Sequence, residues 1–268
     1  MAALLLQGAA TVVCLFPLST ERHRLRLKRW WSRNLLAILG VRLDADLRQA
    51  VAGSMLVANH ISWLDIFVIN AALPAAFIAK EEVRHWPLFG WLARLNDTVF
   101  LKRGSRGHAK VIHQEIARIL AAGKNVAVFP EGTTSDGTHV LHFHAALIQP
   151  ALIAGRPVVP VAVSYWEADG ERSLAPRYDG DISLGQCLWA ILARPRLTAR
   201  LVATPALGQN GEDRRTVAAA ARSAICAAAA LPPPSNPPER PAGLPGAGPS
   251  GDRPTDSRSP APEDWATA

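Results

Sequence analysis

Between about residues 50 and 230, short β-rich runs alternate with helical segments, and this alternation constrains the fold more than any other feature. Segment 107–122 carries apolar residues at helical spacing and stops at Gly123, and an Ala-rich helix is expected at about 212–230. Strands separated by helices indicate βαβ units, so we predict an α/β fold with a mostly parallel central sheet flanked by helices. The predicted strands are SMLVAN (54–59), AFIAK (76–80), DTVFL (97–101), NVAVFP (125–130), PVVPVAVSY (157–165) and RLTARLVA (196–203).

The N-terminal residues predict contact with a membrane. Residues 2–18 form the one long apolar run, slightly short of a bilayer crossing, and a signal peptide is disfavoured because no Lys or Arg precedes the run. Residues 22–33 contain six Lys or Arg and no acid, and as a helix they have a basic face and an apolar face. We interpret this as a helix in an anionic lipid interface on the cytoplasmic side of the cell membrane, the alternative being a helix packed on the domain with a solvated basic face. The basic face holds Arg22, Arg26, Arg29 and Arg33, and the apolar face holds Leu27, Trp31, Leu35, Ile38 and Leu39.

Composition excludes several classes of protein. With 49% hydrophobic residues the 268-residue chain is not disordered as a whole, although the final 37 residues hold 11 of its 21 prolines and are expected to be disordered. A single long apolar run also argues against a polytopic membrane protein. The three cysteines suggest neither a disulfide framework nor a zinc site. The net charge of +7 favours a membrane or phosphate partner, and not nucleic acid, because the basic residues cluster beside apolar anchors.

The segment Asn59-His60-Ile61-Ser62-Trp63-Leu64-Asp65 carries the strongest chemical signal, because it lies where a predicted strand ends and a helix begins. A turn there can bring His60 and Asp65 into contact, although they are five residues apart. The aspartate would then orient the imidazole, whose other nitrogen could take a proton from a hydroxyl. The alternative is a helix-capping aspartate beside a structural histidine. Ser62 is interpreted as a turn residue.

Two further segments follow predicted strands. Phe129-Pro130-Glu131-Gly132-Thr133-Thr134-Ser135 can present a carboxylate, hydroxyls and backbone N–H groups to a polyol or phosphate, or can be a simple glycine turn. Lys102-Arg103-Gly104 is a candidate anion clamp, or a solvated surface pair. His139, His142 and His144 lack further ligands at suitable spacing, so no metal site is predicted.

In this order, the segments resemble the glycerolipid acyltransferase family, whose pattern is H-x4-D, a strand-end Arg, an F-P-E-G block and a hydrophobic strand with Pro. The chain shows NHISWLD at 59–65, VFLKR at 99–103, FPEGTTS at 129–135 and VVPVAVSY at 158–165, and KEEVRHWPLFGW at 80–91 is similar to the family's linker. The resemblance implies transfer of an acyl group from acyl-CoA or acyl carrier protein to the hydroxyl of a lysolipid, without a cofactor. It implies that His60 is the general base and Asp65 its partner, and that the acceptor is held by Lys102, Arg103, Glu131, Gly132 and Thr133.

The acceptor is left open between two lysolipids. Lysophosphatidate is expected first, as the family's commonest acceptor. Position 134 is Thr where enzymes acting on lysophosphatidate commonly have Arg, and the run FPEGTTSDG is similar to enzymes that acylate lyso-ornithine lipid. A noncatalytic lipid-binding protein and a hydrolase are the competing classes. The expected organisation is membrane-associating helices at 1–45, a catalytic domain at 46–231 and a Pro-rich tail at 232–268.

Overall fold

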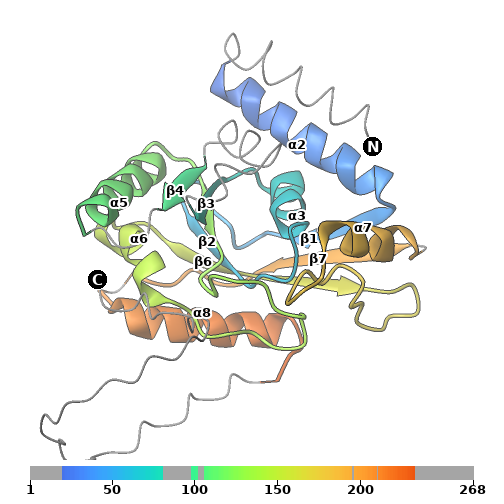
Figure 1. Ribbon diagram of the computed structural model, residues 1–268. Helices are drawn as coiled ribbons and strands as arrows, with labels where there is room; N and C mark the ends of the chain where they lie inside the picture. The colour runs from blue at the N-terminus through green and yellow to red at the C-terminus, as the bar shows by residue number, and fades with distance from the viewer. Residues whose placement is uncertain (1–19, 81–97, 102–105, 195, 210, 233–268) are drawn as a thin grey trace, which may run out of the picture.

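The computed structural model describes residues 20–80, 98–101, 106–194, 196–209 and 211–232. These residues form a central sheet with helices on both faces, as predicted (Figure 1). The strands are β1 (Val41–Asp46), β2 (Met55–Ala58), β3 (Ala76–Lys80), β4 (Val99–Leu101), β5 (Val126–Val128), β6 (Val158–Trp166) and β7 (Leu197–Ala203). The helices are α2 (Glu21–Ile38), α3 (Asp65–Ala72), α5 (Arg106–Ala121), the 3-10 turn η3 (Ala145–Leu147), α6 (Gln149–Ile153), α7 (Leu184–Leu192) and α8 (Arg214–Ala228).

The seven strands lie in the order β1-β7-β6-β2-β5-β3-β4. Strands β2 to β6 all run parallel to one another, and only the β6–β7 pair is antiparallel. Consequently β2, β5 and β4 end at the same edge of the sheet, and the segments that follow β2 and β5 emerge there together. Open α/β sheets bind ligands at the carboxyl ends of their parallel strands, so this edge is where a site is expected.

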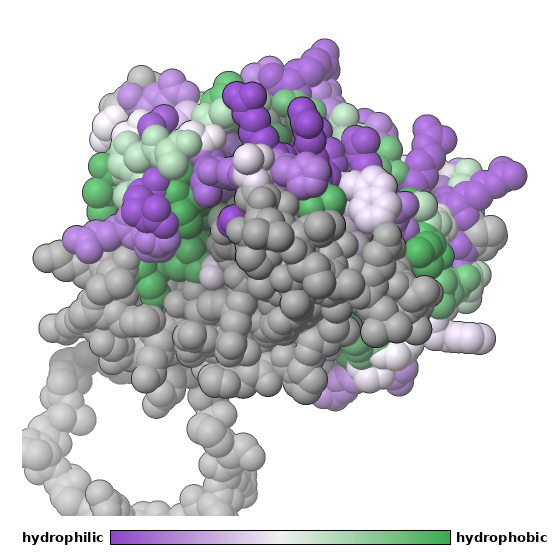
Figure 2. Space-filling view, turned by 90° about the horizontal axis from the view of Figure 1, so that it is seen from above, coloured by the Kyte–Doolittle hydropathy of each residue, from purple (hydrophilic) through white to green (hydrophobic). Residues whose placement is uncertain are grey.

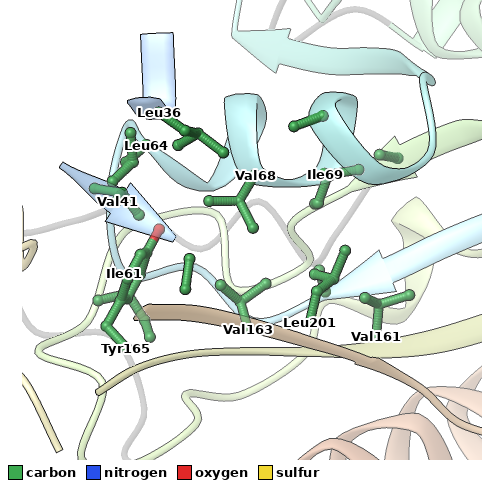
Figure 3. Packing of buried hydrophobic residues seen from close by; sticks show 14 of the residues in the cluster. Leu36, Val41, Ile61, Leu64, Val68, Ile69, Val161, Val163, Tyr165 and Leu201 are labelled. Atoms are coloured by element: carbon green, nitrogen blue, oxygen red, sulfur yellow. The ribbon is translucent and has the colours of Figure 1, made fainter. Parts of the chain in front are cut away.

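Each face of the sheet is covered by its own layer of helices. One hydrophobic cluster joins α2, α3 and α7 to alternate residues of the strands, and a second joins α5, α6 and α8 to the residues between them. In β2, for example, Leu56 and Ala58 belong to the first cluster, whereas Met55 and Val57 belong to the second. The near-continuous apolar runs of the sequence therefore reflect strands that are buried on both faces. Figure 3 shows the first cluster beneath α3.

The six predicted strands are confirmed, with ends that differ by at most two residues. Strand β1 and helices α6 and α7 were not predicted. β1 follows Gly40 shortly after α2. Charged residues stand at every second position of this strand, and its burial alternates from Val41 to Asp44. Residues 2–18, the family-like linker at 81–91 and the tail beyond Pro232 lie outside the described residues. Within the described ranges, no helix is long and apolar enough to cross a membrane.

Most of the apolar face of helix α2 packs on the domain, as in the alternative to a lipid interface. Leu35 and Leu39 are 3% and 2% exposed, and Trp31 packs on Phe67. Part of the basic face is also turned to protein. Lys28, Arg29 and Arg33 donate to the carbonyls of Ala75, Ala72 and Ala71 at distances of 3.1, 2.7 and 3.0 Å, which satisfies backbone oxygens at and beyond the C-terminus of α3.

The alternative that the pattern left open, a helix packed on the domain, therefore describes α2 better. Both readings predict the same period, because a buried stripe and a lipid-facing stripe have the same spacing. Trp30 and Ile38 remain 44% and 46% exposed, and Arg22 and Arg26, of which Arg26 is one helical turn before Trp30, are exposed as well. Figure 2 shows this side of the molecule from above, with hydrophilic side chains prominent and hydrophobic ones among them.

Candidate active site

Asp65 is the first residue of α3, and its buried carboxylate receives four hydrogen bonds. Oδ2 accepts from the backbone N–H of Ile61 at 2.7 Å and of Ser62 at 2.9 Å, and lies 2.8 Å from Nδ1 of His60. Oδ1 accepts from the hydroxyl of Tyr165 at 2.6 Å. These donors and the N-terminal end of the α3 dipole all favour the ionised carboxylate.

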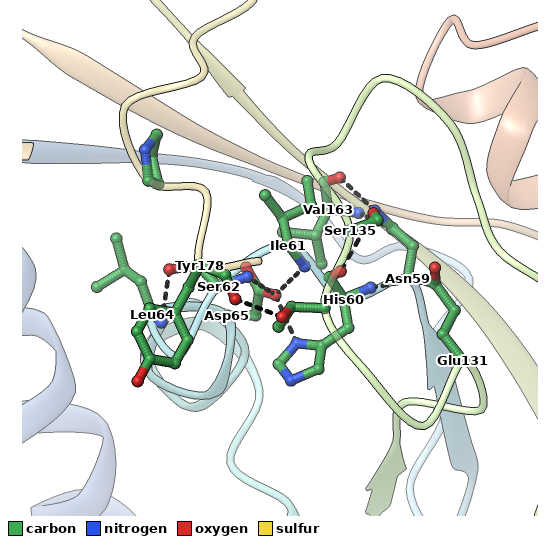
Figure 4. Close-up of polar contacts among 12 residues, drawn as sticks. Asn59, His60, Ile61, Ser62, Leu64, Asp65, Glu131, Ser135, Val163 and Tyr178 are labelled. Atoms are coloured by element: carbon green, nitrogen blue, oxygen red, sulfur yellow. Dashed lines mark hydrogen bonds and ion pairs between the residues drawn. The ribbon is translucent and has the colours of Figure 1, made fainter. Parts of the chain in front are cut away.

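His60 and Asp65 therefore meet through the turn that the spacing required (Figure 4). Because Asp65 can only accept, Nδ1 of His60 carries the proton and Nε2 of the neutral ring is left as an acceptor. The His60 side chain is 19% exposed, whereas that of Asp65 is 0% exposed. Among the described residues, none forms a hydrogen bond with Nε2. This arrangement gives a base that is held from the buried side and open on the other.

Phe129 fixes the plane of the imidazole. Its ring stacks on that of His60 with centroids 3.9 Å apart and planes inclined by 9°, and Phe77 lies behind it at 6.0 Å. The face of an aromatic ring also attracts a cation, so the stack stabilises the imidazolium that forms when His60 takes up a proton.

The backbone of His60 is held by the segment after β5. Glu131 accepts from the N–H of His60 at 2.7 Å through Oε1, and from the N–H of Leu141 at 2.8 Å through Oε2. The N–H of Ser135 donates to the carbonyl of His60 at 2.8 Å. Burial raises the pKa of Glu131 to about 7, against the opposing effect of the two backbone donors. The family resemblance assigns the Glu131 carboxylate to binding of the lysolipid. In the structure the same carboxylate also connects the loop after β5 to the loop that carries His60.

The remaining predicted residues of this loop lie nearer the surface. Gly132 has φ of +70°, a conformation that a side chain would strain, and Thr133 is exposed. Thr134 is turned inward, where its hydroxyl donates to the carbonyl of Tyr178. Gly137 lies so close to Ile61 that an added Cβ would approach its side chain to 3.0 Å, which joins the two loops tightly.

Lys102 and Arg103 lie outside the described residues. The strand before them, β4, ends at Leu101. It pairs with β3 and is the last strand in the sheet order, and its carboxyl end lies at the same edge of the sheet as those of β2 and β5. Their role at an anion site stays a prediction. Ser62 is fully buried, and its hydroxyl accepts from the N–H of Leu64 at 3.3 Å, as a turn residue does. No group of three or more His, Cys, Asp and Glu side chains within the described ranges could hold a metal ion.

Sequence reasoning missed three residues that hold the site. Tyr165 contacts Asp65 and Phe129 contacts His60. The side chain of Asn59 pairs with both the N–H and the C=O of Val163, at 2.8 and 3.0 Å. A buried Asn must satisfy its amide, so a polar residue ending an apolar strand was a usable signal for Asn59. Nothing in the local pattern joins Tyr165 to Asp65, because they are 100 residues apart.

Comparison with known proteins identifies the family of the chain. The family model described as Acyltransferase matches residues 41–164, which include the His60–Asp65 pair and the Glu131 loop. The chain belongs to the acyltransferase family and is an O-acyltransferase.

Two of its relatives are named for different acceptors. It is 40% identical to the 1-acyl-sn-glycerol-3-phosphate acyltransferase of Neisseria meningitidis over 63% of this chain and 67% of that protein. It is 38% identical to the lyso-ornithine lipid O-acyltransferase of Pseudomonas aeruginosa over 73% of this chain and 75% of that protein. The fold is similar to that of the 1-acyl-sn-glycerophosphate acyltransferase of Thermotoga maritima, with a TM-score of 0.57 and 22% identity, covering 84% of this chain and 94% of that one.

Proposed function

We propose that this enzyme moves a fatty acyl group from a thioester to the free hydroxyl of a lysolipid, with His60 as general base. The observation that carries the proposal is the contact of 2.8 Å between Nδ1 of His60 and the buried Asp65, which leaves Nε2 as the acceptor on the open side of the ring. A thioester is already activated, so the enzyme chiefly needs a base and a positioned acceptor.

In the reaction, Nε2 takes the proton from the acceptor hydroxyl as its oxygen attacks the thioester carbonyl. Asp65 and the face of Phe129 stabilise the resulting imidazolium. When the tetrahedral intermediate collapses, the C–S bond breaks and the imidazolium returns its proton to the thiolate, so that an ester and a free thiol leave. No residue has to form a covalent intermediate, and the chemistry requires no cofactor beyond the acyl-CoA or acyl carrier protein that donates the acyl group.

Lysophosphatidate is the first candidate acceptor. The relative from Neisseria meningitidis is named for it, and the positive charge of the chain suits a phosphate headgroup. In this proposal Lys102 and Arg103 hold the phosphate, and Gly132 and Thr133 contact the glycerol, while Glu131 holds the loop that presents them.

Lyso-ornithine lipid is the second candidate, and a specific observation favours it. Thr134 stands where enzymes acting on lysophosphatidate commonly have Arg, and its hydroxyl is engaged by the carbonyl of Tyr178. This loop therefore offers no cation at position 134. Several relatives of similar identity are also named for lyso-ornithine lipid.

We also propose that the enzyme works at the cytoplasmic face of the cell membrane, where lysolipids reside. Two helices on the same face of the sheet expose large apolar side chains, Trp30 and Ile38 on α2 and Trp189 and Leu192 on α7 (Figure 1). Exposed Trp beside Arg suits an anionic lipid interface. Flotation with anionic vesicles tests this: the wild type should float with them, and Trp30→Ser/Trp189→Ser should float less. Equal flotation of the two would count against this surface.

The function is tested by supplying acyl-CoA or acyl carrier protein thioester with lysophosphatidate, with lyso-ornithine lipid, or with no acceptor, and measuring thiol release and lipid product. Release that requires a lysolipid supports the proposal, and the better acceptor identifies the substrate. Release without any acceptor indicates a hydrolase, and no release with any acceptor indicates a lipid-binding protein.

A further inference from the structure

Tyr165 lies on β6 and is 1% exposed. Its ring packs in the cluster beneath α3, among aliphatic side chains that include Ile61 and Val163 (Figure 3). The hydroxyl is the polar end of this otherwise apolar position, and it lies 2.6 Å from Oδ1 of Asp65. A buried phenol needs a partner, and here that partner is the carboxylate that orients the proposed base.

We propose that Tyr165 is a positioning residue of the His60–Asp65 pair. This inference rests on the proposed function, since it assigns to Tyr165 a part in preparing the same base. The hydroxyl donates to Oδ1 and fixes the rotation of the carboxylate, so that Oδ2 faces the imidazole. It also takes up part of the negative charge of Asp65 and so sets how strongly that charge acts on His60.

The distribution of donors over the two oxygens of Asp65 supports this role. Oδ2 has three partners, namely His60, Ile61 and Ser62, whereas among the described residues Oδ1 has Tyr165 alone. Because Asp65 is 0% exposed, water cannot readily replace that partner. Removing the hydroxyl would leave a buried carboxylate oxygen without a donor, which is costly.

Tyr165 remains a donor over the working range of pH. Burial and then the charge of Asp65 raise the pKa of Tyr165 well above its usual value. Among the described residues, the other ionisable groups facing this pair are Glu131, from the loop after β5, and Cys187, from α7. Burial raises the pKa of the Cys187 thiol, so it stays neutral, and of these two groups Glu131 is the one that adds a titration near neutral pH.

The proposal predicts the direction of a change in pH dependence. When Tyr165 is replaced by Phe, Asp65 keeps more of its negative charge and favours the imidazolium form of His60. A protonated ring cannot act as base, so the acidic limb of the kcat/KM profile should move to higher pH. We expect a shift of about one pH unit and a decrease in kcat of about tenfold, with KM for the acceptor nearly unchanged.

The experiment compares Tyr165→Phe with Ser164→Ala as a matched control. Ser164 is the neighbouring buried hydroxyl on β6, but it contacts Trp166 and not Asp65. Both variants remove one buried hydroxyl, and only Tyr165→Phe should move the pH profile. A profile that superimposes on the wild type, or an equal shift in Ser164→Ala, overturns the proposal. The proposal is also overturned if Tyr165→Phe lowers kcat by the same factor in the Asp65→Asn variant as in the wild type.

A second measurement covers the case in which Tyr165→Phe does not fold. The chain contains only two tyrosines, so Tyr178→Phe carries Tyr165 alone. Incorporating 3-fluorotyrosine into Tyr178→Phe makes the remaining phenol a stronger donor, and the acidic limb should then move to lower pH, opposite to the effect of removal. An unmoved limb or a shift to higher pH contradicts the proposal.

Failure of the proposed function would look different. In that case the wild type transfers no acyl group to any lysolipid, and no rate profile exists. The imidazole of His60, assigned by its absence from the NMR spectrum of His60→Ala, can still be titrated with and without fluorotyrosine at position 165. Movement of that titration to lower pH with fluorotyrosine supports the positioning role, and an unchanged titration overturns it.

Discussion

Two loops meet at the same edge of the sheet, and they use their side chains in opposite ways. The segment 59–65 after β2 turns one side chain, His60, towards the open side of the site and anchors it with the buried Asp65. The segment 129–135 after β5 turns most of its polar side chains inward. Glu131 bonds the backbone of His60 and Leu141, and Thr134 bonds the carbonyl of Tyr178.

The difference shows that polar residues in the loops after two neighbouring strands can have different roles, one in chemistry and the other in holding the site. A carboxylate in a strand-end loop suggests contact with a substrate, yet both oxygens of Glu131 accept from backbone N–H groups, and its residue is 4% exposed. The second loop works largely through the first, by fixing where His60 lies and how its ring is inclined. Substitutions in the first loop should therefore affect chemistry, and those in the second should affect stability at least as much.

The largest effect is expected from His60→Ala. Loss of the base should lower kcat by at least about 10²- to 10⁴-fold, while the melting temperature stays close to that of the wild type because the ring is partly exposed. Steady-state kinetics and thermal unfolding check both parts. His23→Ala, an exposed histidine on α2, is the control and should retain full activity. More than a tenth of wild-type activity in His60→Ala would remove this residue from the mechanism.

Asp65→Asn is expected to come next, with a decrease in kcat of about 10²- to 10³-fold. The amide has one acceptor oxygen where the carboxylate has two, so it cannot serve Tyr165, the two backbone donors and His60 together. The imidazole then loses its fixed tautomer. NMR of the ring nitrogens should show the Nδ1 proton lost or exchanging. An unaltered tautomer with reduced activity would mean that Asp65 acts in another way.

Glu131→Gln should have an intermediate effect and separates the two loops most directly. The Gln amide can accept through one oxygen, but its NH₂ would face a backbone N–H, so we expect a loss of about 1–3 kcal/mol in the free energy of unfolding. Activity should decrease about tenfold because His60 is displaced. If activity falls a hundredfold or more with no change in stability, Glu131 acts on the substrate and the contrast between the loops is wrong.

The same residue predicts a pH dependence of stability. Burial raises the pKa of Glu131 from 4.5 to about 7. A raised pKa means that the folded state holds the proton more tightly than the unfolded state does. The resulting contribution of Glu131 to the free energy of unfolding is therefore fully present below pH 4.5 and is lost as pH rises through 7. The loss is at most about 3 kcal/mol. Unfolding between pH 5 and 8 should show a shallower decrease for Glu131→Gln than for the wild type, and parallel curves would contradict this assignment.

Much of the fold was predictable because its information is local. Buried parallel strands appear as short apolar runs, and the six predicted runs became strands of the sheet. The direction of α2's apolar face was not predictable, since the period of a helix does not say whether protein or lipid covers it. The protein covers Leu35 and Leu39, and cations of the opposite side bind carbonyls near the end of α3.

The site was predictable to the extent that it lies in short segments. His60 and Asp65 are joined by one turn, so their contact could be inferred from spacing and from the strand-to-helix boundary. The partners of these residues come from elsewhere in the sheet. Tyr165 and Phe129 reach the pair because β6 and β5 lie on either side of β2, and this neighbour relation exists only once the strand order is known.

The smallest effect is expected from Thr134→Val, which keeps the shape of the side chain and removes its hydroxyl. The lost bond to the carbonyl of Tyr178 should cost about 1 kcal/mol of stability, and kcat/KM for either lysolipid should stay within about threefold of the wild type. We expect this small effect because the segment 129–135 positions the segment 59–65, and Thr134 does not contact the lysolipid. Parallel assays with lysophosphatidate and lyso-ornithine lipid check it, with Thr133→Val on the exposed neighbour for comparison. A tenfold loss confined to one acceptor would place Thr134 in contact with that headgroup, and the division of labour between the two loops would then end at Glu131.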